Sequence, residues 1–159
     1  TNPYYYVFGY SGTNVEDAVA LDNYRTYGVL YNWPAANEAC PEGWHLPTGD
    51  EIVQLSLNLG VWTTAGGRLK ETGTAHWNIP NTDAMNLYGF NALPGGLMLN
   101  NSFYGQSNYG FWWVVQEIDS PFPNQIHSFS LSHDNGYLNN SLYGGYQKDD
   151  AFCIRCLKD

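Results

Sequence analysis

Hydrophobic residues recur with helical spacing in one clear segment of the chain, residues 48–60. Ile52, Leu55 and Leu59 stand at positions i, i+3 and i+7, so they share one apolar face of a helix. Gly60 follows the last of them, and glycine is the usual residue just beyond a helix end. This pattern predicts an amphipathic helix that packs on the core.

Two local signals mark where helices begin. Thr48 and Glu51 are spaced as a capping box, in which the Thr hydroxyl accepts the Glu amide and the Glu carboxylate accepts the Thr amide. Pro34 predicts the start of a second, shorter helix over residues 35–39, because proline is favoured at the first helical position.

Four segments have the patterns of strands. Residues 27–33 predict a buried strand with aromatic side chains, and residues 109–115 predict a central strand. Residues 128–133 alternate serine with Phe, Leu and His, which predicts a half-buried strand. Residues 151–157 predict a closing strand. Because Trp112 and Trp113 are neighbours in the central strand, one of them should face the core and the other the opposite side.

The remaining segments lack a regular period. Residues 66–96 are rich in Gly, Asn, Thr and Pro, which predicts long ordered loops with brief strands, and residues 137–146 read as turn-rich. Residues 1–26 are expected to be irregular, with Tyr4, Tyr5, Tyr6 and Phe8 packed on the body. With no linker or repeat, the chain reads as one α+β domain, 1–159, in which two short helices pack on small antiparallel sheets.

Composition narrows the classes of function. Of the 159 residues, 13% are charged and 16% are aromatic, and the formal net charge is −9. A nucleic-acid binder needs clustered cations, and six Lys and Arg in an acidic chain do not supply them. No apolar run approaches the ~18 residues of a membrane span. We therefore expect neither nucleic-acid binding nor membrane insertion.

Motifs for metal or cofactor chemistry are weak. The four histidines have no metal-ligand spacing, and His45, between Trp44 and Leu46, reads as a core histidine with its hydrogen bonds satisfied. Calcium needs six to eight oxygen ligands. Asp149 with Asp150, and Glu117 with Asp119, are partial candidates, although solvated carboxylates are the simpler interpretation. We expect no metal and no cofactor, with a structural Ca²⁺ as the alternative.

Three cysteines are present, so at least one lacks an intramolecular partner. Cys153 and Cys156 have the C-x-x-C spacing of redox and metal sites. They fall in a predicted strand, however, where residues three apart point to opposite faces. This geometry argues against a shared metal or a redox pair.

Six blocks in chain order carry a family resemblance: YGVLYNWPAA, ACPEGWHLPTGDE, GGRLKETGTAHW, GFNALPGG, YGFWW and AFCIRCLKD. Over residues 25–159 the chain resembles the Fibrobacter succinogenes major paralogous domain. That family has a C-type-lectin-like fold, in the branch related to formylglycine-generating enzyme. The resemblance implies the same fold here.

The resemblance also implies a disulfide and a compartment. In C-type-lectin-like folds a disulfide ties the first helix to the last strand, which assigns Cys40–Cys156 and leaves Cys153 free. A disulfide implies an oxidising environment, hence an extracellular, cell-surface or virion location. Formylglycine-generating enzymes need a cysteine pair at a substrate groove. This chain is shorter and has one cysteine left over, so we expect no enzymatic activity.

A similar architecture serves the variable proteins of diversity-generating retroelements, in which adenine-directed mutation alters surface codons near the C-terminus. Such mutation rarely yields Lys, Glu, Met or Trp, and residues 118–146 contain none of these four. Gln125 is poorly explained by this route. Ordinary Asn- and Ser-rich lectin loops are the alternative. Relatives often read WWSSTE where Val114 and Val115 replace the two serines here.

The Tyr, Ser and Asn content of this C-terminal segment is typical of binding surfaces. We expect an extracellular ligand-binding module, such as an adhesin or phage receptor-binding tip, whose ligand is a protein or cell-surface glycan. The alternatives are a structural surface paralogue within a larger exported or virion protein, and an oxidase. The predicted contact residues are Gln116, Ile118, Phe122, Gln125, His127, Phe129, His133, Tyr137, Asn139, Tyr143 and Tyr146.

Overall fold

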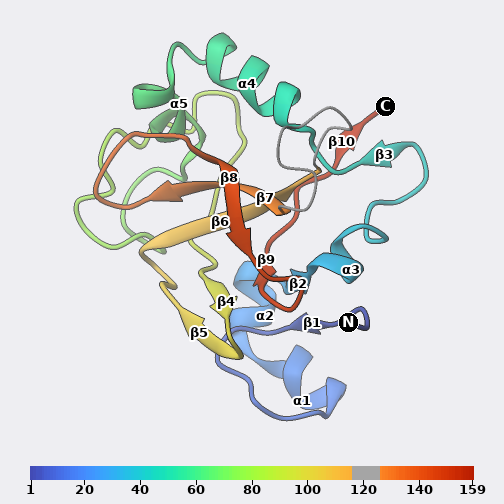
Figure 1. Ribbon diagram of the computed structural model, residues 1–159. Helices are drawn as coiled ribbons and strands as arrows, with labels where there is room; N and C mark the ends of the chain where they lie inside the picture. The colour runs from blue at the N-terminus through green and yellow to red at the C-terminus, as the bar shows by residue number, and fades with distance from the viewer. Residues whose placement is uncertain (116–125) are drawn as a thin grey trace.

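The computed structural model describes residues 1–115 and 126–159, without the side chains of residues 141–145. Its architecture is α+β, as expected (Figure 1). The helices are α1 (Val15–Ala20), α2 (Asp22–Tyr27), α3 (Trp33–Ala36), α4 (Gly49–Asn58) and α5 (Trp62–Leu69). The strands are β1 (Tyr5–Tyr6), β2 (Leu30–Asn32), β3 (Trp44–His45), β4 (Leu97–Leu99), β5 (Ser102–Tyr104), β6 (Tyr109–Val114), β7 (Ile126–Ser132), β8 (Asn139–Tyr146), β9 (Ala151–Phe152) and β10 (Leu157–Lys158).

The strands form three sheets with antiparallel pairing. The largest has the order β1-β2-β9-β4-β5, the second has the order β6-β7-β8, and β10 pairs with β3. Figure 1 shows the β6-β7-β8 sheet between α4 and α5 on one side and the five-stranded sheet on the other. Backbone hydrogen bonds between Cys153 and both Phe111 and Trp113 join β6 to the segment after β9. The chain's first strands and its tail thus meet in one body.

The two neighbouring tryptophans of β6 anchor different core clusters, which confirms that they face opposite sides. Trp112 stacks on Phe129 with ring centroids 5.0 Å apart, in the cluster beneath α4 and α5. Trp113 stacks on Phe152 at 4.1 Å in the second cluster, and its indole donates a hydrogen bond to the Tyr31 carbonyl at 2.6 Å. Both tryptophans are buried, so β6 is covered on both faces.

Helix α4 follows the sequence prediction closely. The Thr48 hydroxyl accepts the Glu51 amide and the Glu51 carboxylate accepts the Thr48 amide, so both halves of the capping box are present. Ile52 and Leu59 are buried in the cluster that holds Trp112. Helix α3 begins at Trp33, two residues earlier than expected, because the Asn32 side chain caps it.

The expectation of two helices was wrong, because the described residues hold five. The first 26 residues are not irregular: they contain β1, α1 and most of α2. Asn14 caps helix α1, because its side chain accepts the Glu16 amide, but the helix buries none of its residues. Without a buried face it leaves no clear hydrophobic period. Tyr6 and Phe8 pack on the core as expected, whereas Tyr4 and Tyr5 are exposed.

Helix α5 was missed because it contains Gly66 and Gly67, and glycine disfavours helices. A Cβ at Gly66 would lie 2.0 Å from the Tyr137 carbonyl oxygen, and a Cβ at Gly67 would lie 2.4 Å from that of Asp83. The two glycines therefore let backbone from two distant loops pack directly on the helix.

The tail also differs from a single strand. It forms β9 and β10, and Cys156 lies between them in a disulfide with Cys40, as the resemblance implied. Cys153 is a free thiol. In the chain-entropy model, a disulfide that closes a loop as long as that between Cys40 and Cys156 contributes about 4–5 kcal/mol of stability.

None of the described helices is long and apolar enough to cross a bilayer.

Candidate binding surface

Strand β7 forms the floor of the candidate surface rather than its exposed part. We expected it to be half-buried, but all of its residues except Ser130 are buried. His127, Phe129 and Leu131 share one face, and the serines between them lie against the second cluster's side of the sheet. Serine is small enough to be buried on that side, so the alternation of polarity does not mark an exposed face.

Two predicted contact residues are therefore corrected. Phe129 is 1% exposed because it stacks on Trp112, and His127 is 5% exposed opposite Val114. Burial lowers the pKa of His127, which favours the neutral imidazole. Neither side chain reaches the surface to contact a ligand. Tyr146 is half-buried and packs edge-on against Phe152, so it belongs mainly to the core.

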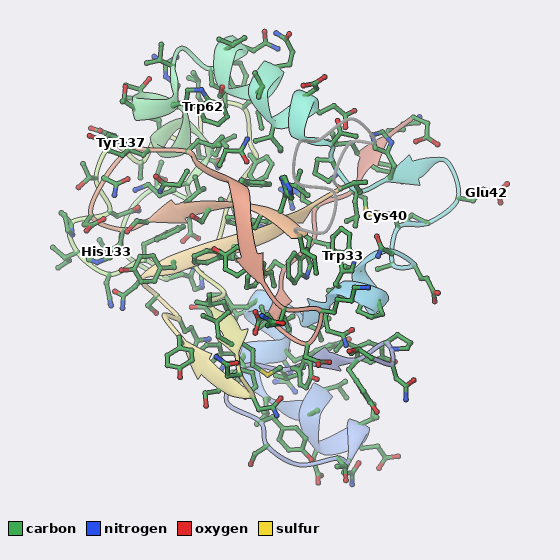
Figure 2. The ribbon with its side chains drawn as sticks, in the orientation of Figure 1. Trp33, Cys40, Glu42, Trp62, His133 and Tyr137 are labelled. Atoms are coloured by element: carbon green, nitrogen blue, oxygen red, sulfur yellow. A yellow bond between two sulfur atoms is a disulfide. The ribbon has the colours of Figure 1, made fainter. Side chains whose placement is uncertain are left out.

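The turn between β7 and β8 carries the predicted contact residues that do reach the surface. Tyr137 is 48% exposed and His133 is partly exposed, and Asn139, the first residue of β8, is exposed as well. Figure 2 shows where His133 and Tyr137 lie. The ring Nδ1 of His133 is 3.1 Å from the Ile79 carbonyl oxygen, and its amide donates to the Asn108 carbonyl at 2.9 Å. We call the exposed side chains of residues 133–139, together with Ile79, the turn surface; Leu138 is buried in the cluster that holds Trp112 and does not belong to it.

The turn surface rests on a second loop, residues 78–91, that lies beside it. The Thr82 amide donates to the His133 carbonyl at 2.9 Å, and the Gly67 amide donates to the Gly136 carbonyl at 3.0 Å. Ile79 is 79% exposed next to His133. The same loop exposes further large apolar side chains, namely Met85, Leu87 and Tyr88.

A buried lysine ties the two loops together. Lys70 has no exposed surface, and its Nζ donates to the carbonyls of Thr82, Ser132 and Asn135 at 2.8, 2.8 and 2.9 Å. Three acceptors match the three N–H groups of an ammonium. The Nζ also lies 5.4 Å from the centre of the Trp77 ring, within cation–π range.

The charge on Lys70 survives its burial at neutral pH. Burial lowers its pKa to about 8, while Asp83 and Asp134 act in the opposite direction. Sequence reasoning missed this residue, because a lysine between Leu69 and Glu71 reads as a solvated charge. Lys70 nevertheless links the backbone of the turn to that of the loop beside it.

The remaining predicted contacts fall outside what the structure describes. Gln116, Ile118, Phe122 and Gln125 lie in residues 116–125, as do the calcium candidates Glu117 and Asp119. Tyr143 lies in β8, but its side chain is not described.

In the other calcium candidate, Asp149 with Asp150, Asp149 is exposed and Asp150 bonds to backbone amides. Asp150 is buried, and its two carboxylate oxygens accept the amides of Gln147 at 2.7 Å and Asn100 at 3.2 Å. Both carboxylate oxygens of Asp150 therefore accept hydrogen bonds from backbone amides. Within residues 1–115 and 126–159, no group of three or more His, Cys, Asp or Glu residues is placed to hold a metal ion.

His45 is hydrogen-bonded, as expected, but it lies at the surface rather than in the core. Its Nδ1 is 2.6 Å from Asp159 and its Nε2 is 3.0 Å from Glu51, so it links the tail to the start of α4. The hydrogen bonds to Asp159 and Glu51 raise the pKa of His45. Burial alone would raise the pKa of Glu51, but its bonds to the Thr48 amide and to His45 lower it overall.

Comparison with known proteins places the chain in a family. No curated protein and no solved structure gives a significant match. The family model described as the Fibrobacter succinogenes major domain matches residues 10–158, which is nearly the whole chain. The chain therefore belongs to the Fibrobacter succinogenes major domain family.

Proposed function

We propose that this protein is an extracellular ligand-binding module with a C-type-lectin-like fold, and that it contacts its ligand through the turn surface. The observation that carries the proposal is the pairing of exposed side chains with a fixed backbone. Tyr137 and Ile79 are 48% and 79% exposed, whereas the carbonyls of Asn135, two residues before Tyr137, and of Thr82, three residues after Ile79, are both bonded to the buried Lys70.

A fixed backbone matters because binding costs entropy when loops must be ordered. The amide and carbonyl of His133, the carbonyl of Asn135 and the carbonyl of Gly136 all have partners outside the turn. The turn surface therefore loses little backbone freedom on contact. Tyrosine adds rigid contact area, and Asn and His add adaptable hydrogen bonds.

Charge and covalent structure support the class of ligand and the location. A net charge of −9 disfavours nucleic acid and anionic membranes, and among the remaining ligands, which include small molecules, a protein or a cell-surface glycan suits a broad uncharged face best. The Cys40–Cys156 disulfide favours an oxidising compartment, such as the cell exterior, the cell surface or a virion.

The state of the cysteines supports a binding role over an oxidase. Cys40 and Cys156 are bonded to each other, and Cys153 is the free thiol. Burial raises the pKa of the Cys153 thiol to about 12, so it is protonated at neutral pH and is a poor nucleophile. A catalytic pair would need a second free cysteine.

Hypervariable display is the specific form of binding that the C-terminal composition favours. Residues 118–146 lack Lys, Glu, Met and Trp, and the turn surface takes up part of that range. A turn whose side chains point outward from a fixed backbone can change sequence without altering the core. The rival role, a structural surface paralogue, does not require surface side chains that can change independently of the core.

Sequencing this gene from close siblings tests the proposal. We expect substitutions to concentrate at exposed positions such as His133, Tyr137 and Asn139, while Lys70 and Phe129 stay unchanged. A nearby reverse transcriptase with a template repeat that matches the C-terminal codons would specifically support display. Substitutions spread evenly over the domain surface would favour the structural paralogue instead.

A further inference from the structure

A hollow lies away from the turn surface, at the end of the molecule formed by β1, α1 and α2. It has a volume of about 790 Å³. Figure 1 shows α1 at the opposite end of the molecule from α5, on which the turn surface packs. Among the described residues, none of the side chains around the hollow is charged, and six are tyrosines: Tyr4, Tyr5, Tyr6, Tyr10, Tyr24 and Tyr31.

The hollow follows an open sheet edge. Strand β1 is an edge strand of the five-stranded sheet, and within residues 1–115 and 126–159 it pairs only with β2. The Asn32 amide donates to the Tyr4 carbonyl, and Tyr6 lies opposite Leu30. In an antiparallel pair every second residue points its backbone groups away from the partner strand. The N–H and C=O of Tyr5 therefore point away from β2. Side chains from both faces of β1 line the hollow, as they must where it runs along the edge.

The wall opposite this edge is apolar and exposed. Val15 and Val19 of α1 are 67% and 39% exposed, and they lie one helical turn apart on the side that faces the hollow. Tyr24 of α2 is 39% exposed. A strand edge beside an apolar helix is an arrangement that binds extended peptides, because the edge supplies backbone hydrogen bonds and the helix supplies side-chain pockets.

The surroundings of the hollow are acidic. Burial first, and then the charge of Asp149, raise the pKa of Tyr6, which places that carboxylate near the β1 end. Glu16 stands beside Val15 in the first turn of α1 and forms no salt bridge within the described residues, whereas Asp17 lies on the face of α1 turned away from Val15 and Val19. Of the cations in these segments, Arg25 is paired with Asp22 at 3.5 Å, and Lys148 adjoins Asp149 in sequence. Carboxylates beside tyrosine faces, in a chain of net charge −9, favour Lys and Arg side chains in a ligand.

We propose that this hollow is a docking groove for an extended basic peptide of a partner protein. The peptide adds as a strand to the open edge of β1, hydrogen-bonded to Tyr5. Its apolar side chains lie against Val15 and Val19, and its Lys or Arg side chains lie near Glu16 and Asp149. The proposal is independent of the turn surface and stands or falls separately from it.

The test is fluorescence anisotropy with labelled, acetylated pentapeptides in which Lys alternates with Val, Leu or Tyr. Matched peptides carry Glu in place of Lys, and a third set is N-methylated at alternate residues. We expect saturable binding of the basic peptides that weakens with added salt, and no binding of the acidic or N-methylated sets. Val15→Lys should weaken binding roughly tenfold or more, because it puts a like charge in the groove.

Leu57→Lys is the matched control, since Leu57 is 58% exposed on α4 and lies outside the groove. It should leave the affinity unchanged. The proposal is overturned if no basic peptide binds at millimolar concentration, or if basic and acidic peptides bind alike. It is also overturned if N-methylation or Val15→Lys has no effect, or if neutral oligosaccharides bind the groove and the peptides do not.

Discussion

Replacing Lys70 with methionine tests the buried link beneath the turn surface. The substitution keeps an unbranched side chain of similar reach and removes the ammonium. Three carbonyls, those of Thr82, Ser132 and Asn135, then lose the donor that now lies 2.8–2.9 Å away. Each buried acceptor left without a partner costs about 1–3 kcal/mol.

Part of this loss is offset, because the folded state no longer desolvates a charge. Removing one partner from a buried, hydrogen-bonded charge typically costs about 3–5 kcal/mol in total, and we expect Lys70→Met to fall in that range. For a domain of this size, each kcal/mol of lost stability lowers the melting temperature by about 2–4 °C. The melting temperature of Lys70→Met should therefore fall by about 6–20 °C.

The assay is urea unfolding followed by tryptophan fluorescence, with Lys148→Met as the control. Lys148 is exposed, so its substitution should change the free energy of unfolding by less than about 0.5 kcal/mol. Hydrogen exchange of the 133–138 amides should also speed up in Lys70→Met more than exchange in α4. A change in unfolding free energy below about 1 kcal/mol in Lys70→Met would refute the assigned role.

Three further changes probe the scaffold. Gly66→Ala should destabilise the protein by about 1–3 kcal/mol in thermal melts, because the added Cβ would lie 2.0 Å from the Tyr137 carbonyl oxygen; a more stable variant would contradict this packing. The Cys40→Ala/Cys156→Ala double variant should lose about 4–5 kcal/mol in urea unfolding, and an unchanged midpoint would argue against the disulfide. The folded state raises the pKa of His45 above 6.5, so its ion pairs add fully to the free energy of unfolding below pH 6.5, as long as Glu51 and Asp159 remain ionised. This contribution to stability is lost as the pH rises through the pKa of His45 in the folded state. Melts of wild type and His45→Gln should therefore differ most near pH 5–6 and converge at higher pH, and a gap that widens above pH 7 would be inconsistent.

Local chemistry made part of this fold readable from sequence. The capping box of Thr48 and Glu51 depends only on residues three apart, and the structure confirms both of its hydrogen bonds. The opposite burial of Trp112 and Trp113 follows from strand geometry alone. The Cys40–Cys156 pairing, by contrast, came from the family resemblance.

What sequence could not supply depends on contacts between distant segments. Gly66 and Gly67 look like helix breakers until Tyr137 and Asp83 are seen against them. Lys70 looks like a surface charge because its three carbonyl partners lie 12, 62 and 65 residues away.

The candidate surface was predicted only in part, for a related reason. An alternation of Ser with Phe and Leu indicates a strand with one polar face, but it does not reveal whether another layer covers that face. Here Ser128 and Ser132 are buried along with Phe129, so exposure shifts from the strand to the turn that follows it. Tyr137 and Asn139 keep their predicted exposure because they lie at the end of the sheet.

The central claim is that a rigid scaffold carries a turn surface whose exposed side chains can contact a ligand and are not needed for folding. A saturation scan of Lys70 and residues 126–140, sorted by protease resistance on a cell-surface display system, measures this directly. We predict that His133, Tyr137 and Asn139 accept most substitutions without loss of folding, while Lys70, Phe129 and Leu131 accept few. If the three turn positions proved as intolerant as the buried ones, the division between scaffold and contact surface would be contradicted.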